Sequence, residues 1–258
     1  MRLRRCFRLL IRRGKICLLL PTGTLRRTGG GHITELPGFA EGAWWIQDAA
    51  ATLPARLLGD IKDKRVADLC AAPGGKTMQL CAAGAQVTAV DISARRMVRV
   101  GENLARAGLS AELITADAGK WITDVTFDAI LLDAPCSGTG TLRRHPDIAW
   151  LKDEEDVARL TLTQDRLLVR AADLLKPGGT LVYAVCSLQE EEGPARLEAL
   201  LARDKRLQRL PVQAAELPGL ADALTPAGDV RTLPSMWPER HGMDGFFIGR
   251  VQKSSGSP

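Results

Sequence analysis

The sequence predicts an α/β fold, with a mostly parallel twisted sheet and helices on both of its faces. From Asp60 onward, short β-branched apolar runs alternate with amphipathic stretches, which is the pattern of successive βαβ units. Three of these runs lead into a cysteine flanked by small or polar residues, at Cys70, Cys136 and Cys186. Because ligands bind at the carboxyl ends of parallel strands, we expect the functional side chains at this edge of the sheet.

The expected strands are apolar, β-branched runs bounded by polar or turn-forming residues. A last strand is expected at residues 245–251, antiparallel to the others at the far side of the sheet. Between residues 207 and 243 the chain is rich in proline and is expected to be irregular. The five earlier strands are predicted at residues 65–69, 86–91, 111–115, 127–133 and 179–186.

Three amphipathic stretches predict helices. Residues 94–107 follow Ser93, which can cap a helix, and precede Gly108, which suits the left-handed end of one. In residues 154–175, apolar side chains recur every three or four positions and form one buried stripe, and the Pro-Gly-Gly sequence that follows then ends the helix. A further helix is predicted at residues 190–202.

Size and charge indicate the domain organisation. With 258 residues, 45% of them hydrophobic, the chain can build one sizeable core or one core with a small appendage. We expect a basic N-terminal segment over residues 1–40, one large domain over 41–252 and a disordered tail over 253–258. Nine arginines and lysines occur in the first 27 residues without an acid, which favours a polyanionic partner. A merely solvated surface segment explains the same charges.

The six cysteines do not form a metal-binding pattern. No Cys-x-x-Cys pair occurs, and no histidine lies at zinc-ligand spacing from a cysteine, so no metal site is expected. Free thiols are typical of a reducing cytosol. Charged residues interrupt the apolar start of the chain, and no later segment is apolar enough for a membrane span. We therefore expect a cytoplasmic protein without a signal peptide or membrane contact.

A glycine-rich turn follows the first predicted strand of the sheet. Its end, Gly75-Lys76-Thr77, matches a phosphate-binding P-loop, but Cys70 stands where that motif requires its first glycine. The G-x-G-x-x-G fingerprint of dinucleotide-binding folds is absent as well, which disfavours a nucleotide-dependent oxidoreductase. Small residues in such a turn still let backbone amides approach a ligand closely.

Acidic residues end the next three strands. An acid at such a strand end can accept hydrogen bonds from the hydroxyl groups of a ribose. Each acid taken alone is also explained as an ordinary turn or cap residue. Their occurrence at successive strand ends, beside one glycine-rich turn, favours a cofactor that contains a nucleoside. The three residues are Asp91, Asp117 and Asp133.

Four segments carry motifs that are highly specific when taken together. They are D-L-C-A-A-P-G-G-K-T at residues 68–77, D-A-P-C-S-G-T-G at 133–140, R-H-P-D-I-A-W at 144–150 and Y-A-V-C-S at 183–187. In order and spacing these segments closely resemble the RsmB-type (NOP2/Sun) RNA 5-methylcytosine methyltransferases. The resemblance extends from about residue 36 to the final strand. It implies a Rossmann-like fold that binds S-adenosylmethionine.

The resemblance also implies roles for the turn and the strand ends. Asp91 would bind the ribose hydroxyls, and Asp117 would bind the adenine edge. Asp133 would lie beside both the cofactor and the target base, and it is suited to hold cytosine by N3 and the amino group. The turn around the methionine and ribose portions would comprise Cys70, Ala71, Ala72, Pro73, Gly74, Gly75 and Lys76.

Two cysteines at neighbouring strand ends fit the chemistry of cytosine methylation. Carbon 5 of cytosine is a poor nucleophile, and addition of a thiolate to carbon 6 makes it electron-rich. A second group can then assist the release of the product. The spacing does not choose between the thiols, but the resemblance implies that Cys186 attacks and Cys136 aids release. A buried, unreactive position is expected for Cys6, Cys17 and Cys81.

Residues near these thiols are candidates for RNA contacts. The target base must leave its stack to reach a thiol, so a flipped or single-stranded base is required. Trp44 and Trp45 could stack on RNA, but packing is the preferred interpretation. The RNA-binding candidates are Arg143, Arg144 and His145, which follow the Cys136 loop, and the pair Gln47 and Asp48.

The expected function is methyl transfer from S-adenosylmethionine to carbon 5 of a cytosine in RNA, with 16S rRNA as the expected substrate and a monomer as the expected state. Many bacterial members of the family carry a further N-terminal domain that resembles NusB, and residues 1–40 would be the remnant of its connection. The alternatives are a tRNA cytosine-5 methyltransferase and a non-catalytic RNA-binding module in ribosome assembly. Because of the Pro135-Cys136 pair, DNA is retained as an alternative substrate.

Overall fold

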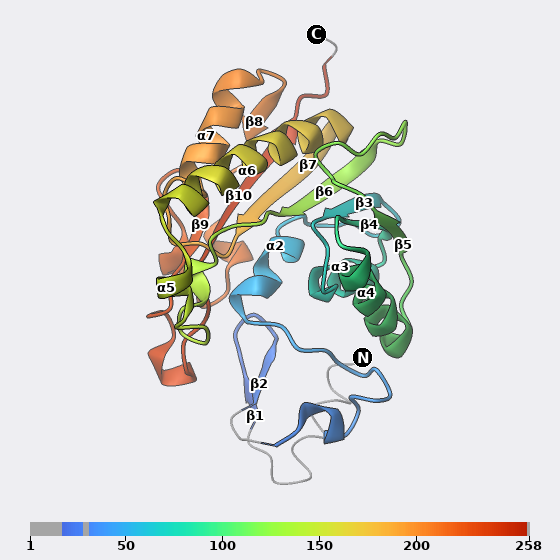
Figure 1. Cartoon of the computed structure of the whole chain (residues 1–258), viewed down its shortest axis with the longest axis vertical. Helices are drawn as coiled ribbons and strands as arrows, with labels where there is room; N and C mark the ends of the chain where they lie inside the picture. The colour runs from blue at the N-terminus through green and yellow to red at the C-terminus, as the bar shows by residue number, and fades with distance from the viewer. Residues whose placement is uncertain (1–16, 28–30, 257–258) are drawn as a thin grey trace.

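The computed structural model describes residues 17–27 and 31–256, and most of them fold around one eight-stranded sheet (Figure 1). The first five strands in sheet order are parallel to one another, and β10 runs antiparallel to β7, β8 and β9. In sheet order the strands are β5 (Glu112–Thr115), β4 (Gln86–Asp91), β3 (Arg65–Leu69), β6 (Phe127–Asp133), β7 (Leu175–Val185), β10 (Phe246–Lys253) and β8 (Leu207–Arg209), while β9 (Val230–Thr232) pairs with β10.

The parallel part has the strand order of a Rossmann-like fold. β3 lies in the middle; the chain winds outward to β4 and β5 on one side and then crosses to β6 and β7 on the other. The order therefore reverses between β3 and β6, and a ligand crevice is expected outside the carboxyl ends of these two strands. The predicted α/β fold with a mostly parallel sheet is confirmed, and so is the antiparallel last strand.

Helices cover both faces of the sheet, as the sequence predicts (Figure 1). On one face, α6 (Glu154–Leu174) and α7 (Pro194–Arg203) share a core cluster with buried leucines and isoleucines of β6. On the opposite face, α2 (Leu53–Arg56) packs with α3 (Gly75–Ala82), and α4 (Ala94–Ala107) packs beside α3. Apolar side chains are therefore packed between the sheet and the helices on each of its faces, and this packing fixes the positions of the strand ends.

An N-terminal hairpin, β1 (Cys17–Leu19) and β2 (Leu25–Arg27), lies apart from the main sheet. Arg26 of this hairpin donates hydrogen bonds to the carbonyl oxygens of Arg240 and Gly242. Cys6 and most of the basic residues of the predicted N-terminal segment lie outside the described residues. The remaining helical turns are α5 (Ile148–Leu151), η1 (Ile33–Glu35), η2 (Ala50–Thr52), η3 (Thr139–Thr141), η4 (Ala214–Glu216), η5 (Ala221–Ala223) and η6 (Pro238–Arg240).

The predicted boundaries hold best where the chain carries its own capping residues. α4 spans the predicted residues, because Ser93 Oγ accepts a hydrogen bond from the Arg96 amide at 3.3 Å and Gly108 ends the helix at φ +62°. The prediction that the Pro-Gly-Gly sequence ends α6 is wrong. α6 ends at Leu174 and β7 begins at once, with residues 176–179 forming an irregularity in its pairing with β6.

Other boundaries differ from the predictions. β5 begins one residue late, at Glu112. α7 begins at Pro194 rather than earlier, because Glu192 turns into the interior and Pro194 suits the first turn of a helix. Lys253, predicted in the tail, is the last residue of β10, and the segment 207–243, predicted to be irregular, contains β8 and β9.

Two features that would indicate other classes of protein are not found in residues 17–27 and 31–256. No group of three or more His, Cys, Asp or Glu side chains there has an arrangement that could hold a metal ion. No helix in this part of the chain combines the length and apolar character needed to cross a membrane.

Candidate active site

The turn after β3 forms one side of the site. Cys70 (φ +64°) and Gly74 (φ +98°) adopt left-handed backbone conformations, which reverse the chain tightly before α3. A Cβ atom at Gly74 would lie 3.1 Å from Val100 Cγ1, so a side chain there would be crowded as well as strained. The Ala71 amide donates to the Val90 carbonyl at 3.0 Å and fixes the turn against the end of β4. The turn is therefore held rigidly.

Asp91, at the end of β4, braces the same turn. Its side chain is 2% exposed; Oδ2 accepts a hydrogen bond from the Ala72 amide at 3.1 Å, and Oδ1 accepts one from the Ser93 amide at 2.9 Å. A carboxylate oxygen that accepts one bond retains a lone pair for a ligand hydroxyl. Asp117, after β5, pairs instead with Arg166 at 3.2 Å. The structure thus brings Asp91 to the turn and Asp117 to the neighbouring strand end.

Lys76 and Asp133 join the turn to the end of β6. Lys76 Nζ lies 2.6 Å from Asp133 Oδ2, and the lysine side chain is largely buried. Burial opposes the charge on Lys76, but the Asp133 carboxylate outweighs it and raises the pKa of the lysine. Lys76 therefore carries a stable positive charge between β3 and β6.

Asp68 is a buried carboxyl group that sequence reasoning does not single out as a site residue. It lies on β3 directly before the turn, and its Oδ2 accepts a hydrogen bond from Thr77 Oγ1 at 2.6 Å. Its Oδ1 is buried without a hydrogen-bond partner among the described residues. Burial raises the pKa of Asp68 to about 7, and the nearby carboxylates of Asp133 and Asp91 act in the same direction.

Cys136 and Cys186 lie together at the ends of the neighbouring strands β6 and β7. Their Sγ atoms are 3.5 Å apart, although 50 residues separate them in the chain. The hydrogen bond with Cys186 raises the pKa of Cys136 well above that of an ordinary thiol, and burial adds to the shift. The same bond lowers the pKa of Cys186, assisted by Lys76 and opposed by burial and by Asp133. Cys186 is therefore the more acidic thiol of the pair.

The remaining cysteines of the described region differ from this pair. Cys81 donates a hydrogen bond to the Ser110 carbonyl at 3.3 Å, and burial raises its pKa to about 11. Burial also raises the pKa of Cys70 above the usual range, assisted by Asp133 and Asp91. Neither environment favours a thiolate at neutral pH. This agrees with an unreactive Cys81 and with a Cys70 that contributes to the shape of the turn.

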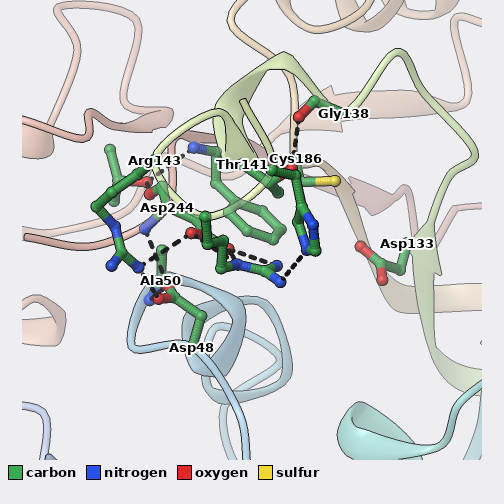
Figure 2. Close-up of polar contacts among 12 residues, drawn as sticks. Asp48, Ala50, Asp133, Gly138, Thr141, Arg143, Cys186 and Asp244 are labelled. Carbon is green, nitrogen blue, oxygen red and sulfur yellow. Dashed lines mark hydrogen bonds and ion pairs between the residues drawn. The ribbon is translucent and has the colours of Figure 1, made fainter. Parts of the chain in front are cut away.

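Two arginines and two aspartates are joined by ion pairs near Cys186, and we call Arg143, Arg144, Asp48 and Asp244 the arginine–aspartate cluster. Figure 2 labels Arg143, Asp48 and Asp244 of this cluster together with Cys186. Asp244 is fully buried; it accepts a hydrogen bond from Arg144 Nε at 2.9 Å and one from Arg143 Nη2 at 3.3 Å. Arg143 Nη2 also lies 3.1 Å from Asp48 Oδ2, and Asp48 Oδ1 accepts from the Asp244 amide at 3.0 Å. Both guanidinium groups remain partly exposed.

The cluster unites some of the predicted RNA contacts and adds one residue. His145 adjoins it, with Nε2 2.7 Å from Arg144 Nη1. Gln47 lies elsewhere, against α3, where its Nε2 donates to Gln79 Oε1 at 3.2 Å. Sequence reasoning misses Asp244, because it stands outside every motif and its only local signal is its position just before β10.

The tryptophans before the sheet are packed rather than presented to solvent. Trp44 Nε1 donates to the Pro37 carbonyl at 3.1 Å, and its ring centroid is 5.3 Å from that of Phe39. Trp45 packs against the core around α3 and α4. The preferred interpretation of these residues as packing groups is confirmed.

Comparisons with known proteins agree with this geometry. Residues 55–252 match the family described as 16S rRNA methyltransferase RsmB/F. Ribosomal RNA small subunit methyltransferase B from Klebsiella pneumoniae is 44% identical over 226 residues, which cover 86% of this chain and 49% of that protein. The corresponding protein from Pseudomonas syringae is also 44% identical, over 229 residues. The chain spans about half the length of the curated relatives it matches.

Solved structures show the same fold. A methyltransferase homologue from Pyrococcus horikoshii superposes with a TM-score of 0.79 at 28% identity, covering 97% of this chain and 82% of that one. NSun6 from Pyrococcus horikoshii, solved with SFG, gives a TM-score of 0.75 at 26% identity, covering 88% of this chain and 57% of that one. With the family match extending over most of the sequence, the chain belongs to the RsmB/F methyltransferase family.

Proposed function

We propose that this chain is the catalytic part of an S-adenosylmethionine-dependent methyltransferase that modifies carbon 5 of a cytosine in 16S rRNA. The observation that carries the proposal is the pair of thiols 3.5 Å apart beside the Lys76–Asp133 ion pair, where the strand order reverses. The relatives named above as ribosomal RNA methyltransferases support the choice of substrate. We further propose that the protein acts as a monomer in the cytoplasm.

The residues at the turn fit S-adenosylmethionine. The tight turn from Cys70 to Lys76 leaves little room for larger side chains and suits close approach of a ligand to the backbone. Asp91 retains lone pairs for ribose hydroxyls, and Asp117 stands at the next strand end for the adenine edge. When bound, this cofactor supplies an electrophilic methyl group. That the relative NSun6 was solved with SFG supports the choice of this class of cofactor.

The two thiols have different roles in covalent catalysis. The Cys186 thiolate forms a bond to carbon 6 of the cytosine, which makes carbon 5 nucleophilic. Asp133 is placed to hold the base edge while Lys76 keeps the carboxylate oriented. After the methyl group has been transferred, the proton on carbon 5 passes to solvent and the electron pair of that C–H bond re-forms the double bond between carbons 5 and 6. The bond between carbon 6 and sulfur breaks at the same time, and its electron pair returns to Cys186. The Cys136 S–H group, at hydrogen-bond distance, stabilises the thiolate that leaves.

The arginine–aspartate cluster is placed to bind the RNA around the flipped base. Arg143 and Arg144 present guanidinium N–H groups to solvent while Asp244 and Asp48 fix their orientation. Guanidinium groups held in this way suit phosphate oxygens, which they can bind through two parallel hydrogen bonds. His145 adds a ring next to Arg144 at the same edge.

Methylation of purified RNA tests the proposal. The chain should transfer tritium from labelled S-adenosylmethionine to 16S rRNA, and bisulfite sequencing should place the product at one cytosine. Methylation of tRNA alone would favour the tRNA alternative, and methylation of DNA alone would favour a DNA substrate. Binding to ribosomal RNA with no transfer to any substrate would contradict an enzymatic role and favour an assembly module.

A further inference from the structure

We propose that Glu192 is a positioning residue that holds the Cys136 loop against Cys186 and keeps the two thiols chemically unequal. This inference rests on the proposed function for its consequence in catalysis, but its physical basis is independent of RNA. Glu192 lies six residues after Cys186, between the end of β7 and the start of α7, and its side chain is fully buried.

The first observation is that Glu192 binds the backbone next to Cys136. Its Oε1 accepts a hydrogen bond from the Ser137 amide at 2.8 Å, and its Oε2 accepts one from Ser137 Oγ at 2.5 Å. Gln164 of α6 donates from Nε2 to Glu192 Oε1 at 3.1 Å and to the Pro135 carbonyl at 2.9 Å. The residues on both sides of Cys136 are therefore bonded to the buried pair of Gln164 and Glu192.

The second observation is that the same group is connected to the Cys186 loop. Ser137 Oγ lies 3.2 Å from Ser187 Oγ, so the residues that follow the two cysteines are in direct contact. The Tyr183 hydroxyl of β7 donates to the backbone carbonyl of Glu192 at 2.5 Å. These bonds fix the relative positions of the two strand ends, and with them the separation of the two sulfur atoms.

The third observation concerns charge. Both carboxyl oxygens of Glu192 accept hydrogen bonds, and no ion pair to Glu192 is found within the described residues. The nearby Arg196 of α7 instead forms an ion pair with Asp165 of α6 at 2.8 Å. Glu192 therefore places a buried negative charge next to Cys136 without a compensating cation.

That charge acts unequally on the two thiols. The charge of Glu192 opposes ionisation of Cys136, in addition to the hydrogen bond with Cys186 and burial, and it helps to raise the pKa of Cys136. Cys186 faces Lys76, Asp133 and Asp244, and Lys76 favours its thiolate. Cys136 thus remains a thiol that donates a hydrogen bond, and Cys186 becomes the thiolate that attacks.

Alkylation of the two thiols tests this inference without RNA or cofactor. The purified full chain is treated with iodoacetamide across pH 6 to 9, and mass spectrometry measures the modification of each cysteine. In the wild type, Cys186 should react at lower pH than Cys136. In Glu192→Gln, which keeps the shape but removes the charge, the preference for Cys186 should fall by about tenfold, the change that one pKa unit produces.

Two further variants separate charge from shape. Glu191→Gln removes the charge of the neighbouring exposed glutamate and should leave the preference unchanged. Glu192→Asp retains the charge, so Cys136 should stay the less reactive thiol. In methylation, Glu192→Gln should lower kcat with little change in KM for RNA, because the contacts of the arginine–aspartate cluster are untouched.

The inference is overturned if Glu192→Gln folds and keeps the wild-type alkylation preference. If that variant does not fold, Ser137→Ala replaces it, because it removes one of the bonds to Glu192 and should reduce the preference in the same direction. An unchanged preference in folded Ser137→Ala would equally overturn it. A chain that methylates no RNA but shows the alkylation change supports the inference and contradicts the proposed function alone.

Discussion

The two sides of the thiol pair are built in different ways. The proposed cofactor side consists of the turn from Cys70 to Lys76 and the end of β4. Its shape follows mainly from the backbone conformation of that short turn, which Asp91, 19 residues after Ala72, braces. The arginine–aspartate cluster is the proposed RNA side, and its Asp48 and Asp244 are 196 residues apart in the chain. Local geometry therefore specifies one side, and tertiary structure specifies the other.

The two sides also differ in how the charge of a buried carboxylate is compensated. Asp244 is fully buried, but Arg143 and Arg144 compensate its charge. Two arginines beside two aspartates leave the cluster close to neutral, so the direction of the exposed guanidinium N–H groups determines what it binds. The carboxyl group of Asp68, next to the turn on the cofactor side, has only the Thr77 hydroxyl as a hydrogen-bond partner among the described residues. We therefore expect variants on the two sides to separate cofactor binding from RNA binding.

Replacement of Cys186, where the two sides meet, should have the largest effect. Cys186→Ala removes the nucleophile, and methyl transfer should fall by about three orders of magnitude or more. Binding of cofactor and RNA should persist, because neither side is altered. Tritium transfer and calorimetry measure the two properties. Cys81→Ala, a change to a thiol hydrogen-bonded to the Ser110 carbonyl, is the matched control, and full activity of Cys186→Ala would contradict the assignment.

Replacement of Cys136 should still allow the attack of Cys186 on the cytosine but slow the release of the methylated base. In Cys136→Ala the departing Cys186 sulfur has lost its hydrogen-bond donor, so a covalent protein–RNA adduct should accumulate as a slow band on a denaturing gel. Alkylation of Cys186 should also move to higher pH, since the bond that lowers its pKa is gone. Normal turnover without such a band would refute the release role.

On the RNA side, Asp244→Asn should weaken RNA binding and leave cofactor binding unchanged. Loss of the buried charge frees Arg143 and Arg144 from their fixed orientation, and KM for RNA should rise about tenfold, within the range for charge-assisted hydrogen bonds. The dissociation constant for S-adenosylmethionine should not change. The exposed Asp222→Asn serves as control, and thermal unfolding verifies the fold. Equal losses for both ligands would show that the two sides are not independent.

On the cofactor side, Gly74→Ala should give the opposite result. A side chain at φ +98° is strained by about 1–2 kcal/mol, and its Cβ would meet Val100 at 3.1 Å. Cofactor affinity, measured by calorimetry, should fall several-fold while RNA affinity is retained. Gly101→Ala lies inside α4 at an ordinary helical conformation and should be neutral or slightly stabilising. A loss confined to RNA affinity in Gly74→Ala would contradict the comparison.

The comparison also explains what could be predicted from the sequence. The strands of the parallel sheet, the capped helix α4 and the turn at residues 70–76 carry local signals, and the structure contains them as predicted or within a few residues. Asp244 and Glu192 were missed because their partners lie far away in the chain. Nothing in the run of three glutamates at residues 190–192 distinguishes the buried one, since only the packed structure turns it inward.

The smallest expected effect concerns Asp68 and tests how the cofactor side carries a buried charge. The folded pKa of Asp68 is about 7, above the value of 3.8 for an exposed aspartate, so the folded state holds a proton that the unfolded chain has lost between these values. The contribution of Asp68 to the free energy of unfolding should therefore fall as pH rises from about 4 to 7. Asp68→Asn does not titrate, and its Tm relative to the wild type should be higher at pH 8 than at pH 5.5. The exposed Asp124→Asn is the control, and an Asp68→Asn curve parallel to the wild type would mean that this carboxylate, like Asp244, has found a compensating partner.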